Sequence, residues 1–154
     1  VCTSKIPFLA ALRLGNVVNN VKGLKPEDIL QAFIKVLHLP KQIDKMSLGD
    51  ALVERESLAS TAIGYGYALP HPRNRILNDE RDAIIAIAYL ENPIEWGSPD
   101  GRPVEVLFLI LSGGDWQHLS FISDAATLVN DARFRDFMAR KPQKDQIIAY
   151  ISGL

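Results

Sequence analysis

The chain has 154 residues, 47% of them hydrophobic, and its 17 basic and 18 acidic residues leave a formal net charge of −1. This balance argues against a nucleic-acid-binding or anionic-membrane-binding protein, and no apolar run approaches the roughly 20 residues that cross a bilayer. A chain of this length is expected to form one domain that buries about two-thirds of its unfolded surface.

The single cysteine, Cys2, excludes an internal disulfide and permits a reducing compartment. We therefore expect a cytoplasmic protein in which Cys2 has no functional role. Residues 1–154 are expected to form a single domain, with residues 1–5 as a disordered or linker N-terminus.

The first third of the chain predicts one strand and two helices. Residues 16–21 fit a short strand. Pro26 opens a helix that ends before the next proline, and its apolar side is formed by Ile29, Leu30, Phe33, Val36 and Leu37. His38 falls at the end of this helix, where a positive imidazole suits the helix dipole, and is interpreted as structural. A second helix over residues 44–56 places Arg55 near its C-terminal end.

Two nearly continuous apolar runs, residues 83–90 and 104–111, predict buried strands. The connection over residues 92–101 is rich in proline and glycine, and its Trp96 is expected to cap the core. A Ser-Gly-Gly turn follows the second run, and His118 lies at the start of the next helical pattern. Strand ends in α/β folds bind ligands, and helix N-termini favour anions.

The last third of the chain is predicted to be helical. Asp115 is the candidate N-cap of a helix with an apolar stripe at Leu119, Ile122, Ala126 and Val129. Asp131 is expected to cap a second helix, and residues 147–151 supply the core face of a third. Strands interleaved with helices predict an α/β fold with a mixed sheet covered on both faces.

The segment from Ala62 to His71 contains a Gly-x-Gly turn followed by Ala-Leu-Pro-His. Imidazole titrates near neutrality and is a good nucleophile when unprotonated. Just upstream, Arg55, Ser60 and Thr61 offer a guanidinium and two hydroxyls, which are groups that hold oxyanions. These residues suggest phosphoryl chemistry at His71, although a lone histidine after proline is also compatible with a purely structural role.

The sequence lacks the motifs of other common catalytic sites. The chain has no P-loop and no Gly-x-Ser-x-Gly nucleophile turn. Its three histidines lack the close spacing of zinc ligands, so we expect no metal and no cofactor. Arg73 and Arg75 could form a basic rim for a phosphorylated or acidic partner, or be ordinary solvated side chains.

Several ordered motifs resemble the type-2 enzyme IIA domains of the bacterial phosphotransferase system, a family that includes fructose, mannitol and nitrogen-regulatory IIA proteins. The family signature is matched in register by Glu56, Ile63, Gly64, Ala68, Leu69, Pro70 and His71. Residues 55–61 resemble its Arg-Glu-x-x-x-Ser-Thr motif, residues 100–104 its approach to the central strand, and residues 117–119 its second histidine site. The resemblance spans roughly residues 6–154.

The resemblance implies a three-layer α/β/α sandwich and a phosphoryl carrier. It implies that Nε2 of His71 accepts phosphate from an HPr-type phosphocarrier protein, with Nδ1–H held by a backbone carbonyl. By the same resemblance His118 donates to the phosphoryl oxygens, Arg55 offsets their charge, and Ser60 or Thr61 adds a hydroxyl. No metal is needed for transfer between nitrogen atoms.

Two residues depart from the family pattern. Tyr67 stands where an aliphatic residue is usual, and its ring is expected to narrow a partner's access. Pro72 stands where Gly, Ala or Cys is preferred. Proline has no backbone N–H, so residue 72 cannot donate to a phosphoryl group.

Three functions are compatible with the resemblance. Because the chain contains no adjoining IIB or IIC segment, we favour a nitrogen-regulatory carrier whose phosphorylation switches binding to a transporter or kinase. The alternatives are a IIA component of fructose or mannitol uptake, which would pass phosphate to a IIB domain, and a degenerate IIA domain that only binds partners.

Overall fold

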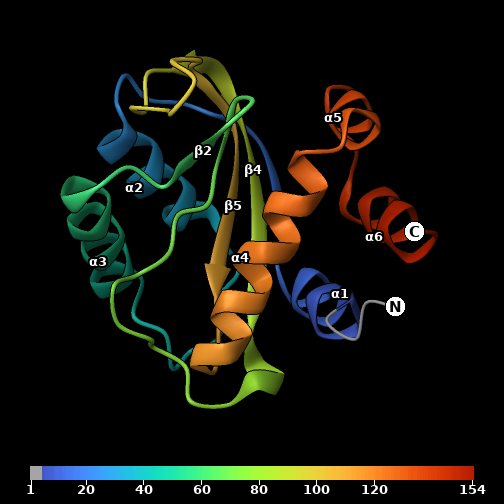
Figure 1. The fold of residues 1–154 in the computed structure, drawn as a ribbon. Coiled ribbons are helices and arrows are strands. Elements are labelled where there is room, and N and C mark those ends of the chain that lie inside the picture. Colours follow the sequence, from blue (N-terminus) through green and yellow to red (C-terminus); the bar gives the residue numbers. More distant parts are fainter. Residues whose placement is uncertain (1–4) are drawn as a thin grey trace.

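The computed structural model describes residues 5–154. A central sheet lies between two groups of helices, with α2 and α3 on one face and α1, α4, α5 and α6 on the other (Figure 1). The predicted three-layer sandwich is therefore confirmed. The helices are α1 (Lys5–Leu14), α2 (Pro26–Val36), α3 (Lys45–Leu58), α4 (Asp115–Val129), α5 (Ala132–Met138) and α6 (Lys144–Ser152), with a short 3₁₀ turn η1 (Glu80–Asp82).

The sheet is mixed, as predicted, and has five strands in the order β1-β4-β5-β3-β2. Its strands are β1 (Val17–Val21), β2 (Ala62–Gly64), β3 (Tyr67–Ala68), β4 (Ile84–Ile94) and β5 (Val104–Leu111). The long central pair β4 and β5 is antiparallel. β3 runs parallel to β5, and β1 runs parallel to β4. The parallel β3–β5 pairing carries the chain after β3 and the chain after β5 to the same end of the sheet.

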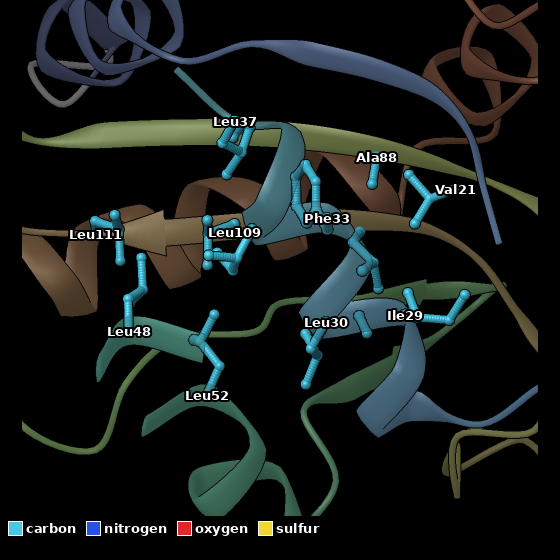
Figure 2. Packing of buried hydrophobic residues seen from close by; sticks show 14 of the residues in the cluster. Val21, Ile29, Leu30, Phe33, Leu37, Leu48, Leu52, Ala88, Leu109 and Leu111 are labelled. Atoms are coloured by element: carbon cyan, nitrogen blue, oxygen red, sulfur yellow. The ribbon is translucent and has the colours of Figure 1, made fainter. Parts of the chain in front are cut away.

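Each face of the sheet has its own hydrophobic core. On one face, Phe33 of α2 and Leu48 and Leu52 of α3 pack towards strand residues such as Leu109 and Leu111 (Figure 2). On the other face, Phe121 and Phe134 pack with Phe108 and Tyr67. Successive side chains of a strand point to opposite faces, so the continuous apolar run of β5 supplies both cores. This explains why its bounds follow so directly from the sequence.

The N-terminal helix α1 was not predicted. The expected linker covered residues 1–5, but Lys5 already begins α1, and its ammonium donates to the carbonyl oxygens of Ser152 and Leu154 at 2.9 and 2.8 Å. Burial of Phe8 and Leu12 against the sheet gives this helix its core face. The interpretation of Cys2 lies outside the described residues.

The predicted end of β4 was also wrong. β4 continues to Ile94, because the pairing with β5 shifts register after Tyr89 and resumes where Ile94 faces Val104. A bulge of this kind lets a strand pass through an Asn-Pro sequence that looks like a loop. Trp96, just beyond it, is 4% exposed and packs in the core on the α2 and α3 side, as expected.

The predicted apolar face of α4 was partly correct, since Val129 is buried and Ile122 packs against the core. Gly114, not Asp115, is the N-cap, and the buried positions include Phe121, Ala125 and Val129. Leu119, expected in the core, is 58% exposed. Its exposure places an apolar side chain on the surface next to His118. Among residues 5–154, no helix combines the length and the apolar character needed to cross a membrane.

Candidate functional site

His71 is positioned by a rigid turn and a short strand. The strands β2 and β3 form a hairpin whose central residues, Tyr65 and Gly66, both have positive φ angles of 59° and 87°, as in a type I′ turn. Beyond β3, the Leu69 amide donates to the Thr61 carbonyl at 3.0 Å, and the Ile110 amide donates to the Pro70 carbonyl at 3.0 Å. The segment carrying His71 is thus held to both of its neighbouring strands.

The imidazole of His71 is itself oriented by the backbone. Its Nδ1 lies 2.8 Å from the carbonyl oxygen of Leu69. A carbonyl can only accept a hydrogen bond, so Nδ1 carries the proton and Nε2 has the free lone pair. The arrangement selects one tautomer without any carboxylate.

His118 reaches the same place from β5 and the first turn of α4. Gln117, which is 9% exposed, holds this turn: its Oε1 accepts from the Gly113 amide at 2.7 Å and its Nε2 donates to the Glu80 carbonyl at 3.0 Å. A Cβ at Gly113 would lie 2.1 Å from the Asp79 carbonyl oxygen, so the turn requires glycine. The structural role of Gln117 was missed, although a polar residue in an apolar helix face is the available signal.

The two histidines meet although they are far apart in the sequence. Their ring centroids are 4.7 Å apart, with an angle of 61° between the ring planes. The rings lie in the wall of a cavity of about 320 Å³, which we call the His71 cavity; its other lining residues include Arg55, Pro72, Arg73 and Arg75. The structure thus brings together the three side chains expected to be catalytic, His71, His118 and Arg55.

The cations around the His71 cavity differ in how they are held. Arg55, in the last turn of α3, donates from Nη1 to the Ala59 carbonyl at 2.7 Å. Arg75 pairs with Asp115 at 2.6 Å and donates from Nε to the Leu77 carbonyl. Arg73 makes no side-chain hydrogen bond or ion pair to residues 5–154. Both arginines after His71 line the cavity, which is compatible with either interpretation of these residues, a basic rim or solvated side chains.

Burial and positive charge favour the neutral form of both imidazoles. Desolvation lowers the pKa of His71, its hydrogen bond to Leu69 opposes this, and Arg55 lowers it further. Desolvation also lowers the pKa of His118, with a contribution from His71, while Asp115 acts in the opposite direction. Both rings are consequently neutral at pH 7 and can offer one donor and one acceptor each.

Ser60 and Thr61 do not line the His71 cavity. The Ser60 hydroxyl donates to the Trp96 carbonyl at 2.6 Å. The Thr61 hydroxyl and amide donate to the two carboxylate oxygens of Glu56 at 2.7 and 2.6 Å. Their protons are committed to these contacts, which fasten the end of α3 to the start of β2. The phosphoryl-binding role of the two hydroxyls stays a prediction.

One further expectation, for Tyr67, changes with the geometry. Tyr67 does not approach the His71 cavity: its ring is buried against Phe108 near the other end of β5, so it cannot narrow access to His71. His38 is exposed after α2, where its amide donates to the Asn16 side chain. Within residues 5–154 there is no cluster of three or more His, Cys, Asp or Glu side chains that could hold a metal ion.

The chain matches a known family over most of its length. The profile of the phosphoenolpyruvate-dependent sugar phosphotransferase system EIIA 2 family matches residues 11–153. The nitrogen regulatory protein of Pseudomonas aeruginosa is 29% identical over 137 residues, which are 86% of each chain. The fructose-specific EIIABC component of Bacillus subtilis is 27% identical over 137 residues, which are 86% of this chain and 21% of that protein.

Solved structures agree with the fold. The nitrogen regulatory protein IIA-Ntr from Neisseria meningitidis has a TM-score of 0.75 at 20% identity, covering 93% of this chain and 94% of that one. The mannitol IIA component from Escherichia coli, solved in complex with phosphorylated mannitol IIB, has a TM-score of 0.66 at 14% identity, covering 90% of this chain and 95% of that one. The family profile and the shared fold together show that this chain belongs to the EIIA 2 family of the phosphoenolpyruvate-dependent sugar phosphotransferase system.

Proposed function

We propose that this IIA protein carries its phosphoryl group on Nε2 of His71. The observation that supports this most directly is the 2.8 Å contact between His71 Nδ1 and the Leu69 carbonyl, which leaves Nε2 unprotonated. The lowered pKa of His71 keeps that nitrogen nucleophilic at neutral pH. The donor is a phosphorylated HPr-type carrier protein.

The transfer is an exchange of two P–N bonds. The bond between phosphorus and the donor's histidine nitrogen breaks as the bond to His71 Nε2 forms, and the donor imidazole leaves with the electron pair. The proton on Nδ1 stays on His71, where the Leu69 carbonyl stabilises the positive ring that results. Such transfers depend on positioning and charge stabilisation more than on covalent work by the protein.

His118 and Arg55 act on the phosphoryl oxygens in this proposal. The neutral imidazole of His118 has one N–H to donate, and its ring lies next to that of His71. The arriving group carries about two negative charges, which raises the pKa of any nearby imidazole and strengthens that hydrogen bond. Arg55, in the wall of the same cavity, offsets the charge. Pro72 offers no backbone donor, so these side chains take a larger share of the work.

In this proposal the carrier serves regulation. The chain matches the Pseudomonas aeruginosa nitrogen regulatory protein over 86% of both chains, and the nitrogen regulatory protein IIA-Ntr from Neisseria meningitidis has the same fold. In this proposal phosphorylation of His71 changes the charge of the cavity mouth and thereby switches binding to a regulated transporter or kinase. The alternative is delivery of the phosphoryl group to a IIB domain in sugar uptake.

Phosphorylation in a reconstituted system tests the assignment. The protein is incubated with phosphoenolpyruvate, enzyme I and HPr-type carrier, and bound phosphate is measured for acid lability and alkali stability. His71→Ala should abolish labelling. The exposed histidine outside the cavity provides the matched control, because His38→Ala should label fully. Retained labelling of the His71→Ala protein would refute the proposal.

To separate regulation from uptake, the phosphorylated protein is mixed with a fructose or mannitol IIB domain. Rapid loss of the label to IIB supports uptake. A stable label, together with a difference in affinity for a candidate transporter or kinase between the two phosphorylation states, supports regulation.

A further inference from the structure

A second cavity, of about 360 Å³, lies at the other end of the central strands. Its wall includes the start of β5 and the end of β4, whereas the His71 cavity lies at the end of β5. We call it the Tyr67 cavity. Part of its wall is aromatic, formed by Tyr65, Tyr67 and Tyr89. Its volume falls in the range of ordinary small-molecule sites, and the proposed phosphoryl transfer makes no use of it.

The charges around the Tyr67 cavity are balanced but not paired with one another. The cations are Arg102, Arg135 and Lys141, and the carboxylates are Glu91, Glu105 and Asp136. No ion pair joins any two of these six within residues 5–154. Of the six, only Glu91 forms an ion pair, with Lys22 outside the wall at 3.7 Å. A ligand carrying charge of both signs can satisfy both groups, whereas a simple anion or cation satisfies only one of them.

Tyr67 contributes a hydroxyl to this wall. The residue is 5% exposed, yet its hydroxyl makes no hydrogen bond to any residue in the described part of the chain. The side chain lines the cavity and lies within the electrostatic influence of Arg135 and Glu105. A hydroxyl without a partner in the protein can donate to or accept from a polar ligand atom in the cavity.

The hairpin turn holds a guanidinium in place beside the cavity. Tyr65 has a φ of 59°, a conformation that a bulky residue adopts only under strain. Its ring lies under Arg135, whose Cζ is 3.9 Å from the ring centroid. Arg135 also donates from Nη1 to the Val129 carbonyl at 2.7 Å. These two contacts fix the guanidinium and leave its other N–H groups free for a ligand.

We propose that the Tyr67 cavity binds a free α-amino acid with an apolar or aromatic side chain. The ligand's carboxylate contacts Arg135 and Arg102, and its ammonium group contacts Glu105 or Asp136. Its side chain packs on the tyrosine rings and on Met138, which also lines the cavity. This binding does not depend on phosphoryl transfer at His71.

Calorimetric titration with L-phenylalanine and L-leucine tests the proposal. We expect a dissociation constant of about 1 mM or tighter for at least one of them. Two analogues of L-phenylalanine separate the charges: 3-phenylpropionate lacks the ammonium group and phenethylamine lacks the carboxylate. Each should bind about tenfold more weakly or worse. No binding of either amino acid at about 10 mM would overturn the proposal, as would 3-phenylpropionate binding as tightly as L-phenylalanine.

Two conservative variants locate the site. Tyr67→Phe removes the hydroxyl but keeps the ring, and should weaken binding about three- to tenfold. Tyr150→Phe is the matched control, since that half-buried ring stacks on Phe137 outside the cavity, and should bind as the parent does. Amide NMR shifts should fall on residues 65–67 and 135. Equal affinity of all three proteins, or shifts confined to other residues, would contradict the assignment.

Discussion

The two ends of the central strands carry cavities of similar size and different charge. The His71 cavity, about 320 Å³, is lined by two neutral imidazoles, three arginines and a single carboxylate that already pairs with Arg75. The Tyr67 cavity, about 360 Å³, has three cations and three carboxylates. Volume therefore does not distinguish their ligands. The excess of positive charge suits a phosphoryl group at one end, and the balance of charge suits a zwitterion at the other.

Of the substitutions that distinguish the two cavities, His118→Ala should have the largest effect, on the rate of phosphoryl transfer. Loss of one donor to the developing charge should slow transfer from the phosphorylated carrier by about 10²–10³-fold, measured by rapid quench. Amino-acid binding at the Tyr67 cavity should not change. The His38→Ala protein controls for the loss of an imidazole. Transfer at the parent rate would reduce His118 to a helix-end structural residue.

Gly113→Ala should disturb the His71 end through its backbone. A Cβ at this position would meet the Asp79 carbonyl carbon and oxygen at 2.3 and 2.1 Å, so the turn before α4 must shift. We expect the free energy of unfolding to fall by about 1–3 kcal/mol in urea, together with slower transfer. Gly153→Ala has only contacts of 3.6 Å to accommodate and serves as the control. Equal stability of the two variants would show that this turn adjusts freely.

Arg55→Lys tests whether the guanidinium fork matters beyond its charge. Lysine keeps the positive charge but cannot both donate to the Ala59 carbonyl and present a planar pair of donors. We expect transfer to slow by about tenfold, equivalent to about 1.4 kcal/mol in the barrier. Arg13→Lys changes an exposed arginine of α1 and should have no effect. An undiminished rate in Arg55→Lys would leave charge alone as the contribution of residue 55.

Phosphoryl transfer at the His71 cavity and amino-acid binding at the Tyr67 cavity should also depend differently on pH. His71 and His118 have pKa values below the ordinary 6.5, so the unfolded chain binds protons more readily than the folded one. The stabilisation that the neutral rings provide is complete above pH 6.5 and is lost as the pH falls through the folded-state pKa values. Transfer should decline over the same acidic range, below that of a free histidine. Burial raises the pKa of Tyr67, so amino-acid binding should be constant between about pH 6 and 8.

Pro72→Gly should have the smallest effect. The substitution restores an N–H beside His71 but frees the backbone, so the free energy of unfolding should fall by about 1 kcal/mol or less. We expect transfer to become modestly faster if the site lacks that donor. Transfer at the same or a lower rate would instead assign rigidity as the role of Pro72. If neither form accepts phosphate while partners still bind, the protein is a binding module only.

Local patterns in the sequence predicted the elements whose bounds depend on their own residues. The bounds of β5 were predicted correctly at residues 104–111, because every residue except Glu105 is apolar, as expected of a strand buried on both faces. The N-cap Asp131 was also predicted correctly, since its side chain accepts from the Arg133 amide. The end of β4 and part of the predicted face of α4 were wrong. There, a glycine N-cap and a bulge decide the register, and neither has a distinctive local pattern.

The chemistry of the His71 cavity was only partly accessible from the sequence. His71, His118 and Arg55 were identified from motifs, and the fold brings them to one cavity. Ser60 and Thr61 have suitable groups and lie close in sequence, but their hydroxyls face Trp96 and Glu56. The residue type defines what a side chain can do, whereas its partner in space decides whether that capacity is free.

The amino-acid sequence by itself determined the family, the alternation of strands and helices, and the presence of a histidine after Pro70. Only the tertiary structure decided that His71 and His118 face each other at 4.7 Å, and that Tyr67 belongs to a second cavity with six charged side chains. The physical reason is that β3 and β5 are parallel neighbours. Their pairing aligns segments distant in the chain, and periodicity within one segment carries no information about the register between two.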